Sequence, residues 1–195
     1  MKKQLILASA SPRRRELLET AGYEFSVVTS HVEEITGGMN GREVARSNAL
    51  AKARDVYSKN RSSVVVGADT VVCLGDDIMG KPVNRQDAAN MLLRLSGTVH
   101  SVVTGYAVVS DKGEVSDYCE TFVRFRDLSE AEINAYVATG ESDDKAGAYG
   151  IQERASLFVE HIDGDYFNVM GLPVASIYPL LKDADILPRW QKLLL

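Results

Sequence analysis

Short apolar runs that are typical of buried strands alternate along this chain with segments whose apolar residues recur at helical spacing. The strand-like runs cover 5–8, 25–28, 63–66, 70–74, 99–109 and a segment that ends near residue 125. Helices are predicted from 12 towards 22, over 43–57, over 85–95, from 130 to just before 140 and over 173–181. Strands interleaved with helices and joined in places by hairpins predict an α/β fold with a mixed twisted sheet and flanking helices.

Three tight turns between strand-like runs predict the hairpins. They lie at 75–77, at 111–113 and at Asp163-Gly164. The last turn separates apolar runs over 155–162 and 166–169, and an Asp-Gly pair in such a place is the favoured two-residue hairpin turn.

Length, charge and cysteine content set the broad class. A chain of 195 residues can build one full core, so we expect a single domain, 1–195, with two lobes. A net charge of −5 argues against a general partner of nucleic acids or of anionic membranes. Cys73 and Cys119 form no metal or disulfide pattern, and no apolar stretch approaches the roughly 18 residues of a membrane span. These features predict a cytoplasmic protein.

Three consecutive arginines open the first predicted helix. Ser11 stands at the N-cap and Pro12 at the first helical position, so Arg13 and Arg14 fall in the first turn. Cations at this positive end of the helix dipole cost about 0.3–1 kcal/mol each, which suggests that they meet an anion such as phosphate. A solvated basic patch is an equally good explanation of this stretch alone. Arg15 has no predicted role and is expected to face solvent.

A carboxylate interrupts the apolar residues around 64–72. Burying Asp69 without a partner would be costly, so we expect it to face a cleft, a metal or a cation. The alternative is a tight turn in which Asp69 accepts hydrogen bonds from nearby backbone amides.

Other charged residues allow two readings each. Lys81, between a glycine and a proline, is either a held point charge or an exposed loop lysine. Lys52 lies at the border of the apolar stripe of its helix, where snorkelling is the ordinary explanation. Glu33 and Glu34 either cap or solvate, or a carboxylate there joins Asp69 around a hard cation such as Mg²⁺.

Several common catalytic patterns are missing from the sequence. There is no GxxxxGK[ST] phosphate loop, no GxGxxG after the first strand and no GxSxG elbow. The three histidines, His31, His100 and His161, are isolated and are expected to be structural or surface residues. Basic and acidic residues are left, a combination that suits metal-assisted phosphoryl chemistry.

At this point an ordered set of motifs resembles the Maf family of nucleoside triphosphate pyrophosphatases. The motifs are LILASASPRRRELL, the Val32-Glu33-Glu34 segment, ALAKA, VVVGADTVV, MGKP, LRLSG, DKAGAYGIQ and IDGDYFNVMGLP. Each is weak alone, but together they run in order from Leu5 to about Leu181. The resemblance implies a fold related to inosine triphosphate pyrophosphatases, with a cleft between two lobes, and a homodimer.

The resemblance also implies a reaction and roles for individual residues. The reaction is hydrolysis of a nucleoside triphosphate to the monophosphate and pyrophosphate with a divalent metal, Mg²⁺, Mn²⁺ or Co²⁺. Asp69 would accept the proton of the attacking water and, with Glu34, serve the metal. The residues implied on the phosphates are Ser9, Arg13, Arg14, Lys52 and Lys81.

Within the family, Arg13, Thr70 and Gln152 are similar to the branch that acts on dTTP and UTP. Gln152 is usually followed there by glycine, whereas Glu153 follows here; if that position needs a positive φ, the loop would be strained. One alternative is a 7-methyl-GTP or broad-range pyrophosphatase. Another is a nucleotide-binding regulator of cell division, although a pure binder would not need the acidic pair.

Overall fold

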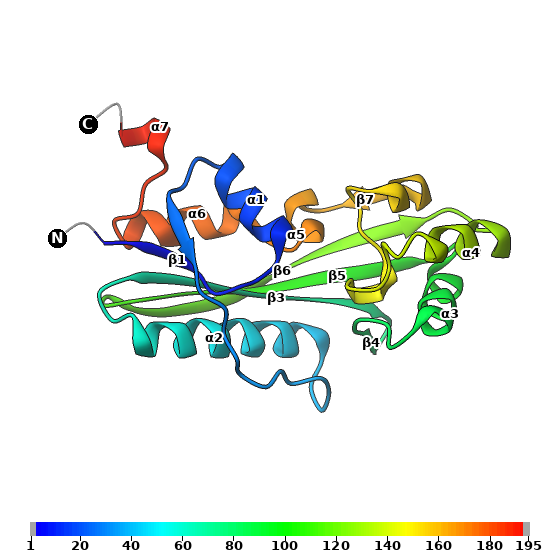
Figure 1. Cartoon of the computed structure of the whole chain (residues 1–195), viewed down its shortest axis with the longest axis horizontal. Coiled ribbons are helices and arrows are strands. Elements are labelled where there is room, and N and C mark those ends of the chain that lie inside the picture. The colour runs from blue at the N-terminus through cyan, green and yellow to red at the C-terminus, as the bar shows by residue number, and fades with distance from the viewer. Residues whose placement is uncertain (1–2, 193–195) are drawn as a thin grey trace.

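The computed structural model describes residues 3–192, which build one seven-stranded mixed sheet (Figure 1). The strands are β1 (Leu5–Leu7), β2 (Phe25–Val27), β3 (Val64–Leu74), β4 (Asp77–Met79), β5 (Val99–Ser110), β6 (Gly113–Phe125) and β7 (Val159–Asp163). Their order is β2-β1-β3-β5-β6-β7, with β4 paired to β3. β1 runs parallel to β2 and β3, and the other pairs are antiparallel. The predicted α/β class and mixed sheet are confirmed.

Helices cover both faces of the long central strands (Figure 1). They are α1 (Pro12–Thr20), α2 (Gly41–Lys59), α3 (Arg85–Leu95), α4 (Glu130–Ala138), α5 (Tyr166–Met170), α6 (Val174–Asp183) and α7 (Arg189–Lys192). α2 lies along one face, and α1, α5 and α6 lie on the other. Over residues 3–192, no helix combines the length and apolar character needed to cross a membrane.

The helix starts follow the sequence signals. Ser11 accepts a hydrogen bond from the backbone N–H of Arg14, and Pro12 occupies the first turn of α1, as predicted. Ser129 and Glu132 form a reciprocal capping box at the start of α4. These local bonds satisfy backbone N–H groups that a helix leaves unpaired at its start.

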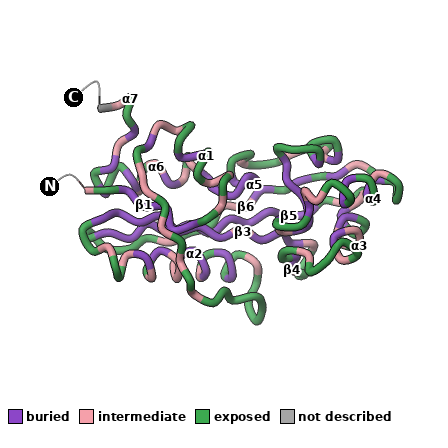
Figure 2. Tube along the Cα trace, in the orientation of Figure 1, coloured by how far each residue is buried: buried purple, intermediate pink, exposed green. Residues whose placement is uncertain are grey.

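Alternation along β3 divides the core into two sides (Figure 2). Val64, Val66 and Val72 join the large apolar cluster under α1 and α6. Val65 and Val71 belong instead to the two smaller clusters that also contain residues of α2. The buried strands thus separate two differently built layers.

Two glycines let α2 lie directly on the sheet. A Cβ added at Gly67 of β3 would come within 2.2 Å of the carbonyl oxygen of Ala49, and one at Gly105 of β5 within 2.1 Å of the carbonyl carbon of Ala45. Both contacts are with helix backbone, so no side-chain rotation could relieve them. The close approach brings the polar residues of α2 down to β3.

Two predictions about local structure are wrong. The runs over 63–66 and 70–74 are one continuous strand, β3, because Gly67 and Asp69 keep the ladder with Ala107 and Gly105 of β5. The tight-turn alternative for Asp69 is therefore also wrong.

The predicted hairpin at Asp163-Gly164 is absent. β7 ends at Asp163, and residues 154–158 form a 3₁₀ turn rather than a strand. The carboxylate of Asp165 accepts a hydrogen bond from the backbone N–H of Phe167 and so starts α5. An N-cap one residue beyond the Asp-Gly pair overrides the turn signal.

Candidate active site

Asp69 projects from β3 towards α2 and is held there at both carboxylate oxygens. Oδ1 accepts a hydrogen bond from Nζ of Lys52 at 2.7 Å, and Oδ2 accepts one from Nδ2 of Asn48 at 3.0 Å. Asn48 and Lys52 are one helical turn apart, so one face of α2 supplies both donors. Asp69 is only 8% exposed, and these two partners fix the plane of its carboxylate.

Lys52 joins Asp69 to a second carboxylate. Its ammonium lies 2.7 Å from Oε1 of Glu34, and its side chain is only 12% exposed. Snorkelling is therefore the wrong explanation of Lys52, and the expected approach of Glu34 to Asp69 is observed. Partial burial would raise the pKa of Glu34, but the hydrogen bond and charge of Lys52, helped by Lys81 and Arg14, lower that pKa.

Asn48 is a residue that the sequence predictions missed. It is 3% exposed, its Oδ1 accepts from the backbone N–H of Ile35 at 2.9 Å, and its Nδ2 donates to the carbonyl of Ile35 at 2.9 Å. The same Nδ2 reaches Asp69, so Asn48 holds the segment after Glu34 beside Asp69. Its position four residues before Lys52 was the signal that could have found it.

Arg14 is fixed by three acceptors from distant parts of the chain. Nη1 donates to Oγ of Ser9 at 3.0 Å, Nη2 to Oγ1 of Thr70 at 2.9 Å, and Nε to the carbonyl oxygen of Gly171 at 2.8 Å. Burial lowers the pKa of Arg14, while the charge of Asp69 opposes that shift. A solvated patch is therefore the wrong reading for this arginine.

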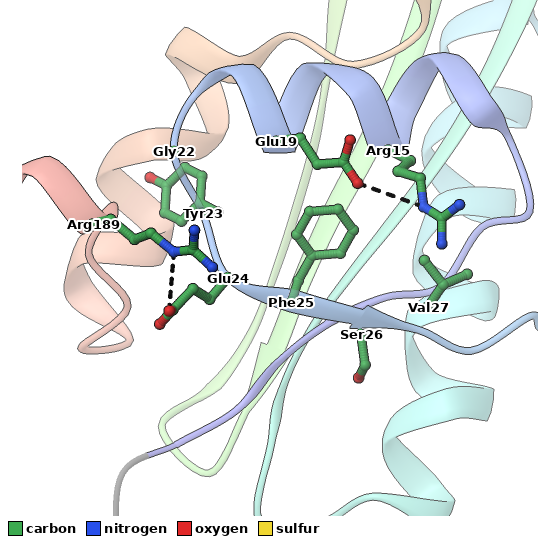
Figure 3. Close-up of a pocket in the computed structure, with 9 residues that line it drawn as sticks. All are labelled: Arg15, Glu19, Gly22, Tyr23, Glu24, Phe25, Ser26, Val27 and Arg189. Atoms are coloured by element: carbon green, nitrogen blue, oxygen red, sulfur yellow. Dashed lines mark hydrogen bonds and ion pairs between the residues drawn. The ribbon is translucent and has the colours of Figure 1, made fainter.

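The other two arginines of the run differ from Arg14. Arg13 lines the same cavity and makes no hydrogen bond or ion pair with residues 3–192 that would hold its guanidinium. Arg15 points away into a separate hollow of about 430 Å³ between α1 and β2, where its Nε lies 3.7 Å from Oε1 of Glu19 (Figure 3). With a side chain 60% exposed, Arg15 faces solvent, as predicted.

Every residue singled out in the sequence lines one cavity of about 650 Å³. These residues are Ser9, Arg13, Arg14, Glu34, Lys52, Asp69, Thr70, Lys81 and Gln152. They come from the start of α1, from the segment before α2, from α2, from β3 and from two loops. Lys81 is exposed at the rim, so the cavity has fixed cations on one side and a mobile side chain on another.

The loop that carries Gln152 contains a second missed cation, Lys145. Its side chain is 7% exposed, and Nζ donates to the carbonyl of Glu141 at 2.6 Å and to the carboxylate of Asp144 at 3.0 Å. Nζ also lies 3.3 Å from Oε2 of Glu153. Glu153 has a φ of −107°, so the strain considered for this position does not arise.

The histidines carry no part of this site. His100 is buried, and its Nε2 shares a hydrogen bond of 2.8 Å with the hydroxyl of Tyr149, while His31 and His161 are exposed. Among residues 3–192, no group of three or more histidine, cysteine or acidic side chains is placed to hold a metal ion. A metal at this site would draw its remaining ligands from water or substrate.

Comparisons with known proteins agree with this geometry. Residues 4–184 match the family model described as Maf-like protein. A dTTP/UTP pyrophosphatase of Bacillus cereus (strain ATCC 10987 / NRS 248) is 47% identical over 94% of this chain and 91% of the relative. A dTTP/UTP pyrophosphatase of Bacillus anthracis is 46% identical over 94% and 97%. The solved Ham1 protein of Staphylococcus aureus aligns with a TM-score of 0.55 over 93% of this chain and 100% of that one, at 11% identity, and so shares the fold.

Proposed function

The chain belongs to the Maf family, and we propose that it hydrolyses dTTP and UTP to the nucleoside monophosphate and pyrophosphate. The observation that carries the proposal is the Asp69 carboxylate, held by Asn48 and Lys52 in a cavity that Arg13 and Arg14 also line. A buried acidic group that faces clustered cations matches a reaction in which water attacks a polyphosphate. Relatives at 46–47% identity bear the name of this activity.

In the proposed reaction, Asp69 is the general base. The oxygen of water forms a bond to the α-phosphorus, the bond from that phosphorus to the β-bridging oxygen breaks, and pyrophosphate leaves with the bonding electrons. A carboxylate oxygen of Asp69 takes the proton that the water loses. Asn48 and Lys52 keep that carboxylate from rotating, which preserves its aim at the water.

The cations stabilise negative charge on the phosphates. The Arg14 guanidinium is already oriented by Ser9, Thr70 and Gly171, so little freedom is lost when a phosphate oxygen meets it. Arg13 has no partner to give up among residues 3–192, which leaves its paired N–H groups for the same tail. Lys81 at the rim can follow the leaving pyrophosphate.

A divalent metal fits the donor set of the site. Asp69 and Glu34 both approach Nζ of Lys52 at 2.7 Å, so their oxygens converge on one small region. Mg²⁺ and similar hard cations are commonly held by one or two carboxylates together with substrate phosphates. When bound, the metal would neutralise phosphate charge and lower the pKa of water, and Glu34 and Asp69 would hold it.

Base selection is assigned to Gln152, with Arg13 and Thr70 beside the phosphates. Gln152 is exposed on the cavity wall, and its amide can both donate to and accept from a uracil or thymine edge. The ion pair between Lys145 and Glu153 anchors the residue that follows it.

The test is release of pyrophosphate by the purified chain, with dTTP, UTP, dCTP and 7-methyl-GTP, each with Mg²⁺, Mn²⁺ or Co²⁺. We expect dTTP and UTP to give the highest kcat/KM. Preference for 7-methyl-GTP would overturn the assigned base, and nucleotide binding without pyrophosphate release would indicate a regulator instead. A homodimer and a cytoplasmic location complete the proposal, and sedimentation velocity and cell fractionation would test them.

A further inference from the structure

A chain of hydrogen bonds runs from the candidate site into the opposite layer of the protein. Arg14 donates to Thr70 at 2.9 Å, and the Thr70 hydroxyl lies 2.9 Å from that of Thr104 on β5. Thr104 donates in turn to the carbonyl oxygen of Asn168 on α5 at 2.9 Å. Thr104 and Asn168 are fully buried and line no part of the candidate cavity, so the function has given them no role so far.

The chemistry of the end groups fixes the direction of every bond in this chain. A guanidinium can only donate and a backbone carbonyl can only accept. The Thr104 proton is committed to Asn168, so Thr70 must donate its own proton to Thr104 and accept from Arg14. Thr70 therefore has no hydroxyl proton left for a nucleotide base.

The far end of the chain is anchored on the sheet. Nδ2 of Asn168 donates to the carbonyl of Val102 and to the hydroxyl of Thr121, both at 2.9 Å. Rotating this amide by 180° would set its oxygen against the Val102 carbonyl, so the observed orientation is the one the site accepts. Three residues after Asn168, the carbonyl of Gly171 accepts from Nε of Arg14. α5 thus holds Arg14 twice, through Gly171 directly and through the two threonines.

We propose that Thr104 and Asn168 are positioning residues that set the direction of the Arg14 guanidinium towards the phosphate tail. Thr70 serves selectivity through Arg14 and not by donating to the base. The inference rests on the proposed function for its phosphate ligand. Its mechanism is separate, because the hydrogen bonds exist without substrate.

The test compares Thr104→Val with Thr104→Ser, because valine keeps the strand-compatible shape and serine keeps the hydroxyl. Thr104→Val should lower kcat/KM for dTTP and dCTP alike by about tenfold and weaken inhibition by inorganic tripolyphosphate by a similar factor. Thr104→Ser should restore both to within about twofold of the wild type. Thr98→Val is the matched control, because it also removes a hydroxyl that donates to a backbone carbonyl, that of Leu95, and contacts no member of the chain.

A second measurement follows Arg14 itself. The side-chain Nε–H signal of Arg14, assigned with Arg14→Lys, should be sharp and slow to exchange in the wild type and in Thr104→Ser, and shifted or broadened in Thr104→Val. An unchanged signal with unchanged tripolyphosphate binding would overturn the inference, as would an altered ratio of dTTP to dCTP with intact tripolyphosphate binding. If the wild type hydrolyses no nucleotide, the proposed function fails, while this signal and tripolyphosphate calorimetry still decide the role of Thr104.

Discussion

Asp69 and Thr70 are neighbours on β3, yet their side chains leave opposite faces of the sheet and are held by different means. On the α2 face, Asp69 meets the charged Lys52 and the amide of Asn48. On the α5 face, Thr70 belongs to a chain of hydroxyl groups that supports one arginine. One strand therefore supplies the candidate base on one side and the support for the phosphate grip on the other.

The comparison shows how each layer obtains precision. The α2 layer relies on close approach of backbones at Gly67 and Gly105, followed by short charged contacts. The α5 layer relies on hydrogen bonds between neutral groups that water does not reach, where an unpaired group is costly. Variants on the two faces should therefore fail in different ways.

The largest expected effect is loss of turnover in Asp69→Asn. The amide can no longer accept a proton from water, so kcat should fall about 10³-fold, while KM for dTTP changes far less. Pyrophosphate release measures kcat, and calorimetry with a non-hydrolysable dTTP analogue measures binding. Glu33→Gln, at an exposed carboxylate nearby, is the control and should keep full activity. A kcat for Asp69→Asn equal to that of the wild type would remove Asp69 from the mechanism.

The three consecutive arginines separate support from contact. Arg13→Ala should lower kcat/KM between about 10- and 100-fold and change the free energy of unfolding by less than about 0.5 kcal/mol. Arg14→Ala should lower kcat/KM as much and also cost about 2 kcal/mol of stability, because it strips partners from Ser9, Thr70 and Gly171. Urea unfolding and initial rates measure the two quantities.

Arg15→Ala is the matched control in this series, because Arg15 lies in the separate hollow of Figure 3. It should leave both quantities near the wild-type values. Equal stability of the Arg13 and Arg14 variants would contradict the idea that only Arg14 is built into the α5 layer.

Gly105→Ala tests the α2 layer without touching a charged group. The added Cβ would collide with the backbone of Ala45 and Arg46, so the free energy of unfolding should fall by about 3 kcal/mol. Activity should also fall, because α2 carries Asn48 and Lys52 away from Asp69. Gly37→Ala, where no atom lies within 4 Å of the added Cβ, should stay within about 0.5 kcal/mol of the wild type. If both variants are equally stable, close packing does not position this layer.

The sequence predicted the contents of the cavity better than its supports. Asp69, Lys52, Arg13 and Arg14 carry charge, and charge in an apolar or helix-start context is visible in a linear pattern. Asn48 was within reach of the same reasoning through its helical spacing from Lys52. Thr104 and Asn168 were not, because their partners lie 34 or more residues away in the chain and threonine in a strand is ordinary.

The errors in secondary structure have the same physical origin. Gly67 resembled a break in a strand because a single sequence does not show which helix will press against it. Asp163-Gly164 resembled a hairpin turn because the cap of α5 at Asp165 uses residue types that also favour turns. Local signals were correct about the presence of a bend and wrong about what followed it.

The smallest expected effect concerns the α5 face of the sheet at His100. His100 follows the alternation of Val102 and Tyr106 and packs edge-on against Phe125 and Tyr149, and burial lowers its pKa from 6.5 to about 4. Between those two values the unfolded chain binds more protons than the folded one, so stability should fall as the pH drops from 6.5 to 4. The loss due to this group is about 2–3 kcal/mol, and it levels off below pH 4.

Urea unfolding at several pH values measures this loss, and an NMR titration of the His100 ring measures the pKa directly. His100→Gln should flatten the dependence on pH, whereas His161→Gln, at an exposed site, should leave it unchanged. Should the His100 variant not fold, the ring titration still decides the matter, because a value near 6.5 would show that water reaches the α5 layer. The contrast between a charged face and a dry, neutral face would then be wrong at this point, since it requires this imidazole to stay uncharged at neutral pH.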